Sequence, residues 1–189
     1  MSNKSIVFAI AACFALLSAP SAQAQKFFSR SAKVTFDATT KSSPEKINAV
    51  SNSGTLVLDK ASGGIQTAVL LKGFLFEKSL MQEHFNENYV ESSKYPKAEF
   101  KGTIENAGAV DFSKDGTYKT NVSGTMTLHG ATKSITAPAV FTVKGGKVSA
   151  KANFTLPFAD YNIEIPSLVS DKVAKQATIE VTTDLAQMK

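Results

Sequence analysis

The chain has 189 residues, of which 43% are hydrophobic and 20% are charged. This composition is typical of a soluble globular protein and excludes an intrinsically disordered chain, which would contain fewer apolar side chains. The formal net charge of +5 comes from lysines that are dispersed among acidic residues, with Arg30 as the only arginine. Because nucleic-acid binding needs concentrated basic charge and commonly uses arginine, we predict no nucleic-acid partner.

The first 24 residues have the pattern of a secretory signal peptide. Lys4 precedes an apolar run from Ile6 to Leu17, and a small-residue Ala-Gln-Ala site ends at Ala24. We expect cleavage after Ala24, which leaves residues 25–189 as one exported domain, periplasmic or secreted, with no integral membrane span. The residues before Cys13 also resemble a lipoprotein cleavage box, so a lipid anchor on Cys13 stays open as an alternative.

Alternation of apolar and polar residues predicts antiparallel strands with one face toward water. The pattern is clearest at residues 122–128, 135–143 and 148–156; other candidates are 34–36, 56–58, a long run at 65–78, 98–104 and 179–181. Glycine-containing turns at residues 61–64, 129–132 and 144–147 are typical of hairpins. We predict an all-β domain in which about eight antiparallel strands close into a barrel, since closure removes exposed sheet edges.

Two segments interrupt the alternation. Apolar residues recur at helical spacing after Ser79, which predicts a helix with Ser79 as its N-cap that runs toward Tyr95 and Pro96. Residues 157–175 are predicted to form a loop with a short helix that begins at Ser170 and Asp171. In this loop, Tyr161 and Ile163 are expected to pack back onto the barrel. We place these one or two short helices near the barrel mouth.

The inward-facing apolar residues are the candidate ligand-binding set. They combine phenyl rings with small side chains, so two interpretations stay open: a hollow lumen that holds one apolar ligand, or side chains that interdigitate and fill the barrel. A hollow lumen would suit a long aliphatic or isoprenoid chain, with polar groups at the mouth for its headgroup. The candidate lumen residues are Phe36, Leu58, Phe74, Phe76, Phe100, Met126, Leu128, Phe141, Ala150, Ala152 and Phe154.

The sequence offers little that is typical of a catalytic site. His84 and His129 are the only histidines, and neither lies in a motif with a nucleophile or an oriented carboxylate. We therefore predict no enzymatic activity, no cofactor and no metal site. His84, Phe85 and Tyr89 are predicted to anchor the helix near the mouth, with His84 forming a hydrogen bond, whereas His129 beside Gly130 is interpreted as a turn residue.

Three stretches carry a resemblance to a known family. Residues 74–102 include FLF, LMQEHFNENY and ESSKYPKAEFKG, residues 122–133 read VSGTMTLHGATK, and the third stretch runs from Phe158 to Pro166. They resemble the YceI-like family of secreted bacterial proteins over nearly all of residues 25–189. The resemblance implies a lipocalin-like barrel that binds a polyisoprenoid or a similar amphiphile in its lumen.

The leading hypothesis is a periplasmic or secreted carrier that holds an isoprenoid or fatty-chain lipid in the barrel without chemistry. The alternative is a filled barrel that acts as an envelope stress or interaction module and has no lipid ligand. The sequence leaves open whether the protein forms a homodimer.

Overall fold

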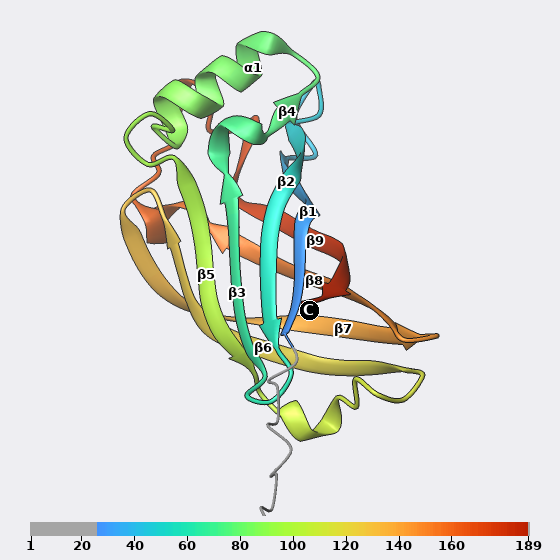
Figure 1. Ribbon diagram of the computed structural model, residues 1–189. Coiled ribbons are helices and arrows are strands. Elements are labelled where there is room, and N and C mark those ends of the chain that lie inside the picture. Colours follow the sequence, from blue (N-terminus) through green and yellow to red (C-terminus); the bar gives the residue numbers. More distant parts are fainter. Residues whose placement is uncertain (1–25, 189) are drawn as a thin grey trace, which may run out of the picture.

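The computed structural model describes residues 26–188, so the predicted signal peptide and Cys13 lie outside the described residues. Its main feature is a closed barrel of eight antiparallel strands (Figure 1). Neighbours follow the order β1-β9-β8-β7-β6-β5-β3-β2, and pairing of β2 with β1 closes the barrel. This confirms the predicted architecture. The strands are β1 (Lys26–Thr39), β2 (Asn48–Asp59), β3 (Gly64–Leu70), β5 (Lys97–Ile104), β6 (Gly116–Leu128), β7 (Ala131–Lys144), β8 (Lys147–Pro157) and β9 (Val173–Gln187).

Two of the predicted hairpins have two-residue turns with left-handed backbone. His129 and Gly130 join β6 to β7 with φ angles of 49° and 76°, and Gly145 and Gly146 join β7 to β8 with φ angles of 56° and 74°. Turns of this kind match the right-handed twist of the flanking strands. Their residues therefore set the register of β6, β7 and β8.

The predicted long strand at residues 65–78 was wrong. β3 ends at Leu70, a single 3-10 turn (η1, Leu71–Gly73) follows, and the short strand β4 (Leu75–Phe76) then pairs with β2. Leu71 and Phe74 are both buried, at 3% and 4% exposure. Since they are three residues apart, a continuous strand would point them to opposite faces. The turn shifts the alternation by one residue, so that both side chains face the interior.

Residues 79–95, called the cover segment below, lie across one end of the barrel (Figure 1). They contain the predicted helix, as α1 (Ser79–His84) followed by one π-helical turn (η2, Phe85–Tyr89). The expected N-cap at Ser79 was wrong, because Lys78 occupies that position and no side chain caps the helix. The helical residues end at Tyr89 because the chain turns at Glu91, which has a positive φ.

The loop between β8 and β9, called the late loop below, contains two 3-10 turns, η4 (Phe158–Tyr161) and η5 (Ser167–Val169). The expected helix at Ser170 and Asp171 was wrong, because β9 begins at Val173 and leaves too little chain for one. Tyr161 packs onto the barrel as predicted and is 1% exposed. Another 3-10 turn, η3 (Ala107–Ala109), follows β5 and lies at the end of the barrel opposite the cover segment (Figure 1).

The barrel interior contains two hydrophobic clusters. The upper cluster lies under the cover segment and includes Phe74, Phe85 and Tyr161, whereas the lower cluster includes Leu58 and Phe141. Two partly buried rings, Phe100 and Phe154, pack against both clusters. They therefore mark the boundary between the halves of the barrel.

A pair of glycines lets the Phe100 ring lie at this boundary. Gly102 and Gly124 are directly opposite each other on β5 and β6. A Cβ atom on Gly102 would lie 2.3 Å from the carbonyl oxygen of Ser123 and 2.6 Å from the tip of the Phe100 ring. No side chain larger than hydrogen fits there unless the two strands separate.

We expect Gly102→Ala to destabilise the protein by about 1–3 kcal/mol, because the new methyl group meets backbone that cannot rotate away. Gly108→Ala is the matched control. Its Cβ would meet nothing nearer than 3.9 Å, so its effect should stay within about 0.5 kcal/mol. Equilibrium denaturation of both variants measures the difference, and equal stabilities would contradict this account of the β5–β6 approach.

Candidate functional site

The upper half of the barrel encloses a cavity of about 430 Å³. Small-molecule sites in proteins commonly measure about 300–1,000 Å³. The upper end of the barrel is therefore hollow, whereas the lower cluster is packed. The structure combines the two interpretations that the sequence left open, one in each half.

Apolar side chains from the strands, the cover segment and the late loop form the cavity wall. Six polar residues also line the cavity. Four of them are exposed and therefore lie at the opening, namely Glu45, Lys78, His84 and Lys172, whereas Ser43 and Tyr89 are half-buried. The apolar lining residues include Val34, Phe36, Leu71, Phe74, Phe76, Phe85, Val90, Ala98, Met126, Leu128, Leu156, Phe158, Ile163, Ile165, Val173 and Ile179.

Phe85 holds the cover segment onto the barrel. Its ring centroid lies 5.0 Å from that of Phe76, 5.6 Å from that of Phe36 and 5.8 Å from that of Phe74. These separations and the inclined ring planes are typical of favourable aromatic pairs. Phe85 therefore packs the cover segment against rings from β1 and β4 and against Phe74, which lies between η1 and β4.

Polar contacts connect the segments around the opening. The Thr40 and Ser42 hydroxyls donate hydrogen bonds to the carbonyl oxygen of Asp171, at 3.1 and 2.6 Å. Lys78, just before α1, forms an ion pair with Glu45, and this contact raises the pKa of Lys78. The β1–β2 loop is thus tied to the late loop on one side and to Lys78, which directly precedes the cover segment, on the other.

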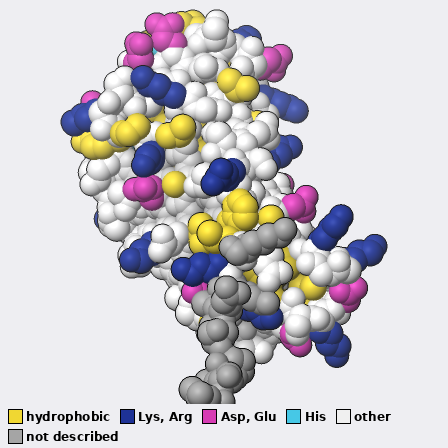
Figure 2. All heavy atoms as spheres, viewed as in Figure 1, with side chains coloured by type: hydrophobic (Ala, Val, Ile, Leu, Met, Phe, Trp, Pro, Cys, Tyr) yellow, Lys and Arg dark blue, Asp and Glu magenta, His cyan; other side chains and the backbone are white. Residues whose placement is uncertain are grey.

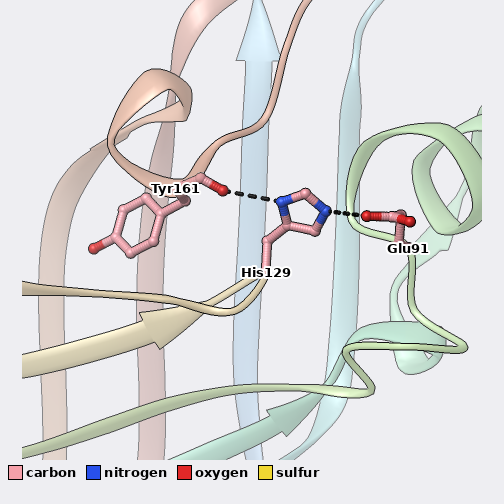
Figure 3. A network of polar contacts seen from close by, with 3 residues as sticks. All are labelled: Glu91, His129 and Tyr161. Atoms are coloured by element: carbon pink, nitrogen blue, oxygen red, sulfur yellow. Dashed lines mark hydrogen bonds and ion pairs between the residues drawn. The ribbon is translucent and has the colours of Figure 1, made fainter.

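The two histidines have roles other than those expected. His84 is exposed at the cavity opening, and none of the hydrogen bonds found in residues 26–188 involves its ring. His129 instead forms the anchoring contacts: its Nδ1 lies 2.9 Å from the carbonyl oxygen of Tyr161, and its Nε2 lies 2.7 Å from a carboxylate oxygen of Glu91 (Figure 3). His129 is a turn residue as interpreted, but it also joins the cover segment to the late loop.

The predicted lumen residues divide between the two halves of the barrel. Phe36, Phe74, Phe76, Met126 and Leu128 line the cavity, as do all three residues predicted near the mouth, His84, Phe85 and Tyr89. The other six predicted lumen residues do not line the cavity: Leu58 and Phe141 are buried in the lower cluster, Ala150 and Ala152 pack against it, and Phe100 and Phe154 lie at the boundary.

Sequence reasoning missed Phe158 and Ile165 of the late loop, and it predicted that Ile163 packs onto the barrel without assigning it to the cavity wall. Alternation could not assign them, because this loop has no regular strand period. The single available signal was the number of bulky apolar side chains in a segment predicted to be a loop.

The described residues provide no other obvious chemical centre. Within residues 26–188, no group of three or more histidine, cysteine, aspartate or glutamate side chains is placed to hold a metal ion. No helix in this part of the chain is long and apolar enough to cross a membrane. On the face shown in Figure 2, basic side chains are spread out and interspersed with acidic ones.

Comparison with known proteins identifies the family. The model of the YceI-like domain matches residues 15–185. The chain belongs to the YceI-like family. A comparison with curated proteins gave no match.

Solved structures of YceI-like and polyisoprenoid-binding proteins share this fold. A polyisoprenoid-binding domain from Saccharophagus degradans superposes with a TM-score of 0.73 at 13% identity, covering 87% of this chain and 99% of that one. For BcnA from Burkholderia cenocepacia the TM-score is 0.65 at 17% identity, with 82% and 96% covered. The YceI protein of Campylobacter jejuni gives 0.55 at 18% identity, with 72% and 81% covered.

The hollow and packed halves should respond differently to one added side chain. Ala98 lines the cavity, whereas Ala139 is buried in the lower cluster. We expect Ala139→Leu to destabilise the protein by about 1–3 kcal/mol through overpacking. Ala98→Leu should change stability by less than about 0.5 kcal/mol, because the cavity accommodates the added carbons. Equal losses in chemical denaturation would contradict the presence of a cavity beside Ala98.

Proposed function

We propose that this protein is an exported carrier that binds the apolar chain of an isoprenoid or fatty amphiphile in the upper half of its barrel. The supporting observation is a cavity of about 430 Å³ with an apolar wall and polar residues gathered at its opening. Such a wall provides no partner for a polar ligand, whereas each buried methylene contributes about 0.8 kcal/mol. The proposal involves no chemical step and no cofactor.

The arrangement of polar groups supports one orientation of the ligand. The tail would lie among Phe36, Met126 and Ile179, and the headgroup would remain at the opening beside Lys78 and Lys172. Lys78 is paired with Glu45, whereas no ion pair is found for Lys172 among the described residues. An uncharged or an anionic headgroup fits this rim.

The cavity supports the carrier over the alternative of a completely filled barrel. Packing against Phe100 and Phe154 fills the lower half, but the rings of the upper cluster leave room for a ligand. One solved relative is described as a polyisoprenoid-binding domain, which is consistent with an apolar chain as the ligand class. Export through a signal peptide that ends at Ala24 is part of this proposal.

The carrier proposal predicts that filling the cavity blocks ligand uptake without unfolding the barrel. Ala98→Phe would place a phenyl ring inside the cavity. We expect at least a tenfold loss of affinity for dansyl-labelled farnesol, because the ring displaces at least two methylenes of the ligand, and their burial corresponds to about that change in affinity. Fluorescence titration measures the affinity, and circular dichroism checks the fold.

Thr155→Phe is the matched control, because Thr155 is exposed on β8. This variant should bind the probe as the wild-type protein does. Equal binding by wild-type protein and Ala98→Phe, or failure of the wild-type protein to bind any long-chain probe, would contradict the proposal.

A further inference from the structure

His129 lies between two hydrogen-bond acceptors. Figure 3 shows its ring between the carbonyl oxygen of Tyr161 and the carboxylate of Glu91, with one ring nitrogen directed at each. A carbonyl oxygen and an ionised carboxylate can only accept, and a neutral imidazole carries a single N–H. Both contacts are therefore satisfied together when the imidazole is protonated on both nitrogens and donates to the carbonyl and to an ionised Glu91 carboxylate.

His129, Glu91 and Tyr161, called the triad below, each lie beside the cavity wall. Val90 precedes Glu91, Leu128 precedes His129, and Tyr161 lies between Phe158 and Ile163 of the late loop; all four of these neighbours line the cavity. The ring of His129 thus joins three wall segments that are not paired with one another as strands. The side chain of His129 is 11% exposed and that of Glu91 is 43% exposed.

The backbone at this junction is strained. Among the described residues, the non-glycine residues with positive φ are Glu91, His129 and Asn162, with φ angles of 44°, 49° and 55°. All three belong to the triad or, like Asn162, directly follow one of its members. Non-glycine residues in such conformations persist where surrounding contacts hold them.

Other titratable groups surround the histidine. The Tyr95 ring meets the His129 ring edge-on with centroids 4.8 Å apart, and the Lys94 ammonium lies 4.8 Å from the Tyr95 centroid. Burial, with a smaller contribution from the charge of Asp160, raises the pKa of Tyr161. Glu91, Lys94 and Tyr95 from the cover segment, and Asp160 and Tyr161 from the late loop, are the groups that face His129 or flank its contacts.

We propose that protonated His129 is a positioning residue that latches the cover segment to the late loop and slows escape of the ligand from the cavity. When the imidazole loses one proton, the lone pair of that nitrogen faces an acceptor. One of the two hydrogen bonds then breaks, and the contact between the cover segment and the late loop loosens. Ligand release then becomes faster as the pH rises and the imidazole loses its second proton. This inference rests on the proposed carrier function.

The test measures the rate at which dansyl-labelled farnesol leaves the full-length mature protein between about pH 5 and pH 9. In the wild-type protein we expect the rate of release to become about tenfold faster across this range. The loss of one hydrogen bond to a charged group lowers the barrier to release by an amount that corresponds to about a tenfold change in rate. His129→Asn, which tolerates the left-handed backbone, should release the probe rapidly at every pH.

Glu91→Gln separates a latch from a merely structural contact. The amide of glutamine donates to Nε2 of a neutral imidazole, whose Nδ1–H still donates to the Tyr161 carbonyl. This variant should therefore release the probe slowly at every pH. Glu87→Gln removes the same charge from an exposed position of η2 and should keep the wild-type pH profile.

A flat wild-type profile, or a Glu91→Gln profile equal to that of the wild type, would overturn the latch while leaving the carrier function intact. If the probe bound at no pH, the carrier proposal would fail instead.

Hydrogen exchange of the ligand-free protein still tests the latch in that case. The Ser92 and Ile163 amides, which bond to the carbonyls of Asn86 and Phe158, should lose protection at high pH in the wild type but keep it in Glu91→Gln. Unchanged wild-type protection would also overturn the latch.

Discussion

The packing of Phe100 and Phe154 across the barrel determines how the rest of the interior is used. Both rings contact the lower cluster on one side and the upper cluster on the other. Phe100 takes this place because Gly102 has no side chain to meet the tip of its ring, while Gly124 lets the backbones of β5 and β6 approach closely. Below the two rings, apolar side chains pack tightly and stabilise the closed sheet. The upper half can therefore stay hollow, since the fold does not depend on filling it.

The structure separates non-directional contacts from directional ones. Within the upper half, the wall of the cavity consists of apolar and aromatic side chains, which accept any chain of suitable width. Directional contacts occur around the cavity: the Lys78–Glu45 ion pair and the hydroxyl contacts with Asp171 at the opening, and the bonds of His129 beside the wall. These bonds hold loops rather than strands. Changes at the rim can therefore alter access to the cavity without altering the barrel.

The sequence predicted most of the barrel because strands and turns depend on local patterns. Alternation located β6, β7 and β8, and the turns at Gly130 and Gly145 were recognisable from residue type alone. The break at Leu71 was missed, because Leu71 donates its N–H to the carbonyl of the distant Pro96, and Pro96 has no N–H with which to continue the pairing of β3 and β5. A local pattern contains no information about a contact of that kind.

The candidate site was predicted only in part, for a similar reason. Alternation indicates which side chains face inward, but not at which height of the barrel a cavity lies. It therefore grouped Phe141 and Ala150 with Phe36 and Met126, although the structure places only the second pair at the cavity. The contacts of His129 were also hidden, since Glu91 and Tyr161 come from segments far apart in the chain.

The central claim is that the upper half of the barrel binds one apolar chain. Native mass spectrometry of the protein purified gently from its own host tests it most directly, with organic extraction to recover whatever is bound. The account predicts one long-chain amphiphile for each folded chain, and a lower occupancy in Ala98→Phe. Wild-type protein that carries no lipid, and takes up none when offered isoprenoid and fatty-chain amphiphiles, would contradict it.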